Sequence, residues 1–241
     1  MAAGLWCQLR HITKSYPVAQ GRQAIFSDLT LDISLDGITV LVGKSGCGKT
    51  TLLRLLANLE TPDQGELVFT RNGIPVQPNI GMVFQESRLF PWMSVAENIM
   101  LSREGWAADA VLPLMDLVGL DRQYQNSRPA ELSGGMAHRV AIARALAYEP
   151  DLLLMDEPFA ALDYFTRMTL QQKVIEIQRQ MHTAVVFVTH NVEEALLLAK
   201  RILVLKKGEI PVSFLVDAAY PRRLEDAMLV QHKKNILDLL L

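Results

Sequence analysis

The sequence is short of cysteine and lacks long apolar runs. It has only two cysteines in 241 residues, Cys7 and Cys47. A disulfide between a strand-like segment near the N-terminus and a glycine-rich loop is not expected, so cysteine usage favours a reducing compartment. No apolar run approaches the ~18 residues of a membrane span, and the first residues lack the basic and then apolar pattern of a signal peptide. Any role at a membrane is therefore expected to depend on a partner protein.

The sequence also lacks an excess of either charge. It has 24 lysines and arginines against 26 aspartates and glutamates, a formal net charge of −2. No segment is strongly basic, which argues against nucleic acid as a partner. Half of the residues are hydrophobic and 21% are charged, as in a globular protein with a large core. The length suits one large α/β domain or a core with an inserted lobe.

What the sequence does contain is a phosphate-binding loop, Gly43-Lys44-Ser45-Gly46-Cys47-Gly48-Lys49-Thr50. It follows the apolar run 38–42, which predicts a buried strand, and precedes the run 51–56, which predicts a helix. Glycines let consecutive backbone N–H groups surround nucleotide phosphates, and a helix N-terminus adds its positive end. We expect Lys49 to bind the phosphates and the Thr50 hydroxyl to bind Mg²⁺.

Apolar periodicity predicts the surrounding fold. Residues 5–12 and 29–34 alternate apolar and polar side chains, and residues 67–69 and 80–84 are further strand candidates. From about residue 86 to residue 149 the spacing is helical. Continuous apolar runs follow at 152–155, 185–188 and 202–205, with helical segments at about 162–181 and 191–200 and a helical tail beyond Pro221. Strands that are apolar on both faces and alternate with helices are typical of a parallel sheet.

Two carboxylates follow one of these runs. Asp156 and Glu157 come directly after the apolar residues 152–155. Ligands of parallel sheets bind at the carboxyl ends of the strands, so we expect Asp156 to bind Mg²⁺ and Glu157 to deprotonate an attacking water. The alternative is an ordinary acidic start of a helix.

Ser133-Gly134-Gly135 precedes a helical segment beginning near Met136. A serine and two glycines at a helix N-terminus form a second anion-binding device, although alone they could be an ordinary cap.

In this order, the motifs resemble those of the ATP-binding subunits of ABC transporters, over nearly the whole chain. The family signature, leucine-serine-glycine-glycine-glutamine, corresponds to Leu132-Ser133-Gly134-Gly135-Met136. The resemblance implies a P-loop NTPase (RecA-like) core of parallel strands, an antiparallel β side sheet and an inserted helical subdomain. It also implies one domain, with residues 1–85 and about 150–220 as the nucleotide-binding core, about 86–149 as the helical subdomain and 221–241 as a C-terminal helix.

The resemblance also implies roles for individual residues. Tyr16 matches the aromatic residue that stacks on adenine, Gln85 the glutamine that reaches Mg²⁺ and the attacking water, and His190 the histidine that holds the γ-phosphate. The expected catalytic residues are Glu157, His190 and Gln85. The expected Mg²⁺ ligands are Thr50, Gln85 and Asp156. The expected nucleotide-binding residues are Tyr16, Gly43, Lys44, Ser45, Gly46, Cys47, Gly48, Lys49, Thr50, Thr51, Ser133, Gly134, Gly135 and Asp163.

The chain departs from the family pattern at the signature, where Ala137-His138 also replace more polar residues, and in a later loop. Met136 replaces the usual glutamine of the signature, and Ala160 stands where serine is common in the loop that ends at Asp163. Because Ser133 and Gly135 provide the expected phosphate contacts, we expect the chemistry to survive the first change. The second removes one hydroxyl that could contact a second subunit.

The family resemblance implies partners as well. Each chain has one phosphate-binding loop and one signature turn, so a working unit needs a second copy, arranged head to tail around two ATP molecules. The segment Leu89–Met93 matches the place where the family receives a membrane permease, although it could instead pack inside the helical lobe. A periplasmic or lipid-anchored solute-binding protein is expected to act indirectly, and the chain is expected at the cytoplasmic face of the cell membrane.

The subgroup is suggested by residues 84–92, by Met136 and by residues 157–163, which look like those of nitrate, sulfonate and taurine importers. In such systems the solute is chosen by the permease and its binding protein. Two alternatives remain open: a soluble ATP-driven switch that acts in assembly, and the ATPase of an exporter. The long coiled-coil or zinc insertions of DNA-repair and chromosome ATPases are absent from the sequence.

Overall fold

The computed structural model describes residues 4–19, 21–101, 108–160 and 162–241. The chain divides into two compact units. Unit 1 contains residues 1–77 and 184–241, and unit 2 contains residues 78–183. The domain boundaries expected from the sequence, near residues 86, 150 and 220, stay a prediction.

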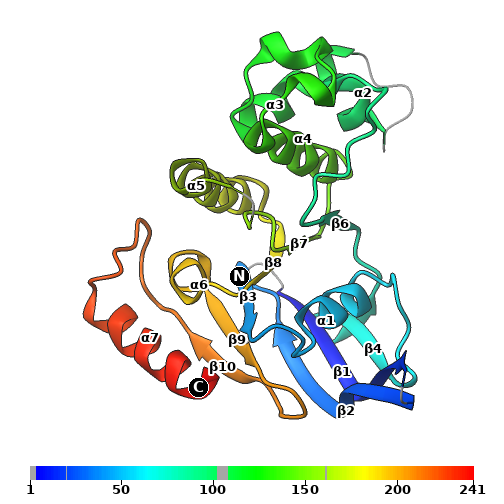
Figure 1. Cartoon of the computed structure of the whole chain (residues 1–241), viewed down its shortest axis with the longest axis vertical. Helices are drawn as coiled ribbons and strands as arrows, with labels where there is room; N and C mark the ends of the chain where they lie inside the picture. Colours follow the sequence, from blue (N-terminus) through cyan, green and yellow to red (C-terminus); the bar gives the residue numbers. More distant parts are fainter. Residues whose placement is uncertain (1–3, 20, 102–107, 161) are drawn as a thin grey trace. The chain divides into compact units, whose positions relative to one another are not determined.

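Unit 1 contains an antiparallel sheet in the order β2-β1-β4-β5 (Figure 1). Its strands are β1 (Leu5–Val18), β2 (Gly21–Ser34), β4 (Gln64–Arg71) and β5 (Ile74–Val76). β1 pairs with β2 along its length and with β4 on its other side. The inward face of β1 supplies Cys7, Leu9 and Ile12, all fully buried. The strand expected over residues 5–12 is therefore confirmed and continues farther than predicted. Its alternation holds from Leu5 to Leu9 and then breaks at His11 (φ +53°), where a register shift places Ile12 on the buried face.

The second sheet segment of unit 1 is mainly parallel, in the order β10-β9-β3-β8. β3 (Ile38–Gly43) lies between the parallel strands β8 (Ala184–Thr189) and β9 (Arg201–Leu205), and β10 (Val212–Leu215) is antiparallel to β9. Every residue of β3 and β8 is buried. Burial of each Val, Leu or Phe side chain contributes about 1.5–3 kcal/mol, so these runs fix the strand that leads into the phosphate-binding loop.

The described residues of unit 1 also form the helices α1 (Lys49–Leu56), α6 (Val192–Leu198) and α7 (Ala227–Leu240). α7 packs beside α6 and β9 through its buried residues Leu229 and Ile236 (Figure 1). It begins six residues after Pro221, and Met228 is exposed. The amphipathic pattern of the tail thus forms a helix over a shorter segment than the sequence indicates.

Unit 2 holds the parallel pair β6 (Ile80–Val83) and β7 (Leu152–Asp156) together with a helical region. The α-helices are α2 (Val95–Met100), α3 (Leu112–Val118), α4 (Gly134–Leu146) and α5 (Tyr164–Met181), and the 3₁₀ turns are η1 (Ala108–Val111), η2 (Arg122–Asn126) and η3 (Pro129–Glu131). α4 packs against both α2 and α3 (Figure 1). The expected combination of parallel strands, antiparallel side sheet and helical region is confirmed. None of the helices in the described ranges is both long and apolar enough to cross a bilayer.

Candidate functional site

The phosphate-binding loop connects the end of β3, at Gly43, with the start of α1, at Lys49. Gly48 has a φ of +108°, and a Cβ there would lie 2.8 Å from Ile25 Cγ2 and 2.9 Å from Phe26 Cζ. Only glycine combines this backbone conformation with so close an approach to β2. At Gly43, a Cβ would lie 2.4 Å from the Leu205 carbonyl oxygen. The loop is therefore pressed against two strands and needs glycine at both points.

Lys49 lies at the start of α1 and is only 6% exposed. Its Nζ donates to the carbonyl oxygens of Gly43, at 2.8 Å, and Lys44, at 3.1 Å. The ammonium group therefore spans the loop that the sequence assigns to phosphate and holds its charge there. The N-terminal end of α1 adds a positive partial charge at the same place.

Tyr16, on β1, lies beside the start of α1. Its hydroxyl donates to Glu60 Oε2 at 2.5 Å and lies 3.4 Å from Thr51 Oγ1. Lys14 Nζ stands 5.3 Å from the centre of the Tyr16 ring. Burial and the Glu60 carboxylate raise the pKa of the Tyr16 hydroxyl, so this side chain stays neutral at physiological pH. The structure thus brings Tyr16, Thr51 and the phosphate-binding loop together within unit 1.

His190 follows β8, also in unit 1, and is exposed. The next residue, Asn191, caps α6 by accepting from the backbone N–H groups of Glu193 and Glu194. The Thr189 hydroxyl in turn accepts from Asn191 N at 3.0 Å. His190 therefore sits at the carboxyl end of a parallel strand, between two positions that local hydrogen bonds fix.

In unit 2, Asp156 and Glu157 are placed by the buried strand β7. Leu152, Leu153, Leu154 and Met155 are all fully buried, and Asp156 is the last residue of the strand. Glu157 has a φ of +44°, in the left-handed region. Such backbone conformations cost about 1–3 kcal/mol and cluster at functional sites. Gln85, beyond the end of the neighbouring strand β6, is exposed.

The signature turn packs against the start of α5. Ser133 caps α4, and its Oγ accepts from Met136 N at 3.3 Å. Gly135 is buried, and a Cβ there would lie 2.6 Å from Thr166 Cγ2. Thr166 N also donates to Asp163 Oδ1 at 3.1 Å, and hydrogen bonds from Thr166 lower the pKa of Asp163. Thr166, which the sequence analysis missed, therefore joins the signature turn to Asp163.

A second residue missed by the sequence analysis is Asn98, which organises the segment Leu89–Met93. Asn98 is fully buried. Its Oδ1 accepts from Phe90 N at 2.8 Å, and its Nδ2 lies 3.0–3.2 Å from the carbonyl oxygens of Phe90, Met93 and Ser94. The sequence signal that could have identified Asn98 is an asparagine among the apolar residues of a short helical segment. A buried side-chain amide needs hydrogen-bond partners, so such a residue is expected to bind nearby backbone groups.

Arg144, on α4, holds the chain just before this segment. Its guanidinium donates to the carbonyl oxygens of Ser87 and Arg88 at 2.9 and 2.8 Å. Phe90 and Trp92 meet edge to face with ring centres 5.4 Å apart, yet the Trp92 side chain is 66% exposed. The segment is thus fixed from inside and presents an aromatic surface outward.

Oxygen donors dominate the residues expected to bind a metal. No cluster of three or more His, Cys, Asp or Glu side chains suited to a metal occurs in the part of the chain that the structure describes. Thr50, Gln85 and Asp156 offer one hydroxyl, one amide and one carboxylate. This donor set fits Mg²⁺, which takes few protein ligands and fills its octahedron with water and phosphate oxygens.

Comparison with known proteins identifies the family of the chain. The family model described as ABC transporter matches residues 26–160. The chain is 40% identical over 230 residues to the aliphatic sulfonates import ATP-binding protein SsuB of Shigella sonnei, covering 95% of this chain and 88% of that protein. It is 42% identical to SsuB 2 of Burkholderia lata (90% and 81% covered) and 36% identical to SsuB of Bacillus thuringiensis (95% and 93%).

Solved structures give the same result. A dimeric post-hydrolysis state of the ATP-binding cassette MJ0796, bound to ADP and Pi, superposes with a TM-score of 0.76 at 28% identity. The match covers 88% of this chain and all of that one. A second dimeric structure of MJ0796, described as a bacterial ABC transporter cassette, has the same TM-score at 29% identity. The phosphate-binding loop, the signature turn and these matches together show that the chain belongs to the ABC transporter family, with the fold of its ATP-binding cassettes.

Proposed function

We propose that the chain is the ATP-hydrolysing subunit of an importer for small organic anions of the aliphatic sulfonate type. The observation that carries the proposal is the glycine-dependent loop at residues 43–50, whose carbonyl oxygens hold the Lys49 ammonium group, in a chain that is 36–42% identical to three sulfonate-import ATP-binding proteins. The likeness extends over 90–95% of this chain, so it includes the segment that would meet a permease as well as the loop.

ATP would bind with its phosphates on the loop and its adenine against Tyr16. Lys49 exchanges its two carbonyl partners for phosphate oxygens, a stronger charge-assisted interaction. The backbone N–H groups of residues 44–51 and the end of α1 supply the remaining donors. Glu60 and Thr51 hold the Tyr16 hydroxyl, which fixes the ring for stacking.

Thr50, Gln85 and Asp156 would hold Mg²⁺ through oxygen atoms. When bound, the ion would neutralise part of the negative charge of the phosphates. In hydrolysis, a water attacks the γ-phosphorus, the bond to the β-phosphate oxygen breaks, and ADP and phosphate leave. Glu157 accepts the proton of the attacking water and Gln85 orients that water. His190 holds the γ-phosphate through a hydrogen bond.

The site would be completed by a second copy of the chain. In a head-to-tail dimer, Ser133, Gly134 and Gly135 of one copy face the phosphates held by the loop of the other, and Asp163 contacts the opposite copy. Thr166 supports this surface because it packs on Gly135 and hydrogen-bonds to Asp163. ATP binding closes the dimer, and loss of the γ-phosphate opens it.

We further propose that this opening and closing drives a membrane permease. Residues 86–149 would act as the helical subdomain and present Leu89–Met93 to a permease helix, while residues 1–85 and 150–220 form the nucleotide core and 221–241 the tail. The exposed Trp92 and the hydrogen bonds by which Asn98 holds the segment, here called the Asn98 clamp, suit such a docking surface. The chain would then lie at the cytoplasmic face of the membrane, and a solute-binding protein would choose the anion.

The experiment that tests transport is an affinity pull-down of the tagged chain from native membranes, with mass spectrometry of its partners. We expect a polytopic permease in stoichiometric amount, and Trp92→Ala should lose it. Recovery of soluble partners alone would contradict the proposal that the chain is part of an importer.

A second experiment tests the loop. Lys49→Ala should lower ATP hydrolysis at least a hundredfold, whereas the surface variant Lys234→Ala should hydrolyse ATP at the wild-type rate. Wild-type turnover by Lys49→Ala would contradict the loop assignment.

A further inference from the structure

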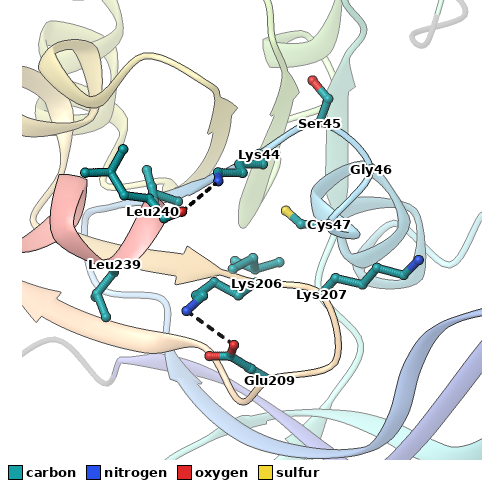
Figure 2. Close-up of a pocket in the computed structure, with 11 residues that line it drawn as sticks. Lys44, Ser45, Gly46, Cys47, Lys206, Lys207, Glu209, Leu239 and Leu240 are labelled. Carbon is teal, nitrogen blue, oxygen red and sulfur yellow. Dashed lines mark hydrogen bonds and ion pairs between the residues drawn. The ribbon is translucent and has the colours of Figure 1, made fainter.

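A cavity of about 330 Å³ lies beside the phosphate-binding loop within unit 1 (Figure 2). Three segments line it: loop residues 44–47, the end of β9 with the turn that follows it, and the last residues of α7. Figure 2 shows the Lys44 side chain reaching from the loop toward the end of α7. The cavity therefore connects the loop with a part of the chain that no step of the proposed hydrolysis uses.

One part of the cavity is apolar. Leu205, Leu239 and Leu240 line it, and the Cys47 side chain also points toward it (Figure 2). Leu205 is itself buried at the end of β9, while Leu239 and Leu240 are half-buried. An alkyl chain placed here would leave water for an apolar surrounding, which stabilises binding by about 0.8 kcal/mol per methylene group.

The rest of the lining is cationic. The lining side chains include three lysines, Lys44, Lys206 and Lys207, and one acid, Glu209, so these side chains carry a net charge of +2 (three minus one). Lys206 Nζ lies 3.2 Å from Glu209 Oε1, and Lys44 Nζ donates to the main-chain oxygen of Leu241, the last residue of the sequence, at 3.3 Å. A bound anion would leave the ion pair between Lys206 and Glu209 intact and would interact with the ammonium groups of Lys44 and Lys207.

We propose that this cavity binds a small organic anion with a short alkyl chain, its acid group on the lysines and its chain against the leucines. At about 30 Å³ for each water-sized group, the volume has room for about ten non-hydrogen atoms. Hexanesulfonate has six carbons and a four-atom head group, which matches that size. A sulfonate, sulfate or carboxylate head satisfies the same lysines.

Binding in this cavity would reach the nucleotide through the loop itself. Lys44 and Cys47 lie within residues 43–50, so an anion behind the loop neutralises Lys44 and restrains the backbone that is proposed to hold phosphate. The anion should therefore weaken ATP binding. This second step rests on the proposed function: a sulfonate that accumulates after import would slow its own uptake. Coupling between two sites typically changes affinity by 5- to 150-fold, and we expect about fivefold here.

The first test measures hexanesulfonate binding to the full-length chain by calorimetry, together with alkylation of Cys47 by N-ethylmaleimide in a Cys7→Ser background. The chain has two cysteines, so replacing Cys7, which is fully buried, leaves Cys47 as the one reporting thiol. We expect saturable binding that slows alkylation. Hexanoate should act similarly, whereas methanesulfonate and hexanol should each bind at least tenfold more weakly. Absence of hexanesulfonate binding, or equal binding of hexanol, would overturn the proposal.

The second test uses variants and ATP. Lys207→Glu should weaken hexanesulfonate at least fivefold, whereas Lys234→Glu, an equal charge change on an exposed face of α7, should not. Equal effects of both variants would indicate a general charge effect and would contradict the assignment of anion binding to this cavity. ATP affinity is then measured with and without hexanesulfonate. Unchanged ATP affinity would overturn the proposed inhibition of ATP binding by the anion. Failure of ATP itself to bind would contradict the proposed function, but it would not affect the test of anion binding in the cavity.

Discussion

At the scale of single residues, the phosphate-binding loop depends on backbone positions that only glycine fills without strain. Gly48 combines a φ of +108° with a close approach to Phe26, and Gly43 lies against Leu205. The loop motif and its strand and helix were predictable from the sequence, because glycine spacing encodes them directly. The contacts that require these glycines join residues far apart in the chain, and no local pattern contains that information.

Gly48→Ala should impair both stability and nucleotide binding. The added Cβ would need φ +108° and would press on Ile25 and Phe26, so we expect the free energy of unfolding to fall by about 1–3 kcal/mol. Gly73→Ala is the matched control, since its φ is +77° but no atom lies within 4 Å of the added Cβ. Chemical denaturation and ATP titration check both variants. Wild-type ATP affinity in Gly48→Ala would refute the explanation.

His138 should make stability depend on pH. It is 6% exposed on α4, and its Nδ1 has no hydrogen-bond partner within the described ranges. Burial lowers its pKa in the folded state. As the pH falls below about 6.5, the ordinary pKa of histidine, the unfolded chain therefore binds more protons than the folded chain. The free energy of unfolding should fall over the same pH range.

We accordingly expect His138→Met to show a smaller loss of melting temperature between pH 7.5 and 5.5 than the wild type. The exposed His182, which ends α5 in the left-handed conformation, provides the control: His182→Asn should keep the wild-type pH dependence. An unchanged pH dependence in His138→Met would show that other groups determine it.

At the scale of elements, the sequence predicts well those described strands that are continuous apolar runs, and it misses short elements that contain no buried residue. β3 and β8 are continuous apolar runs and were predicted well. The short edge strand β10, with Val212 and Leu215 exposed, carries no such run and was missed. The 3₁₀ turns η2 and η3 were missed for the same reason, since neither contains a buried residue.

Asn98 illustrates how one buried polar residue shapes an element that sequence patterns describe only as apolar. Asn98→Ala removes a partner from Phe90 N and from three carbonyl oxygens. We expect a loss of about 2–3 kcal/mol in the free energy of unfolding, and weaker recovery of the permease with ATP hydrolysis preserved. Denaturation, pull-down and phosphate release measure the three effects.

The control for Asn98 is Asn235→Ala, an exposed asparagine on α7 that accepts a hydrogen bond from Gln231. This variant should retain both stability and permease binding. If Asn98→Ala also retained the permease, the segment Leu89–Met93 would not depend on the clamp for docking.

At the scale of the whole molecule, the residues proposed to act in hydrolysis belong to two units and, in the proposed assembly, to two chains. Unit 1 carries Tyr16, the loop and His190, and unit 2 carries Gln85, Asp156 and Glu157. The signature turn of unit 2 would act on the nucleotide of a second copy. The sequence could predict the parts because each is a local motif, whereas Thr166 and the cavity behind the loop emerged only from the fold.

The most direct test of this account is the mass of Glu157→Gln in solution with saturating Mg²⁺ and ATP. Glutamine cannot accept the proton of the attacking water, so ATP should remain bound and hold two chains together. Light scattering should give twice the 26.9 kDa of one chain, and the double variant with Lys49→Ala should stay at the single mass. A Glu157→Gln chain that binds ATP yet remains a monomer would contradict the two-copy mechanism.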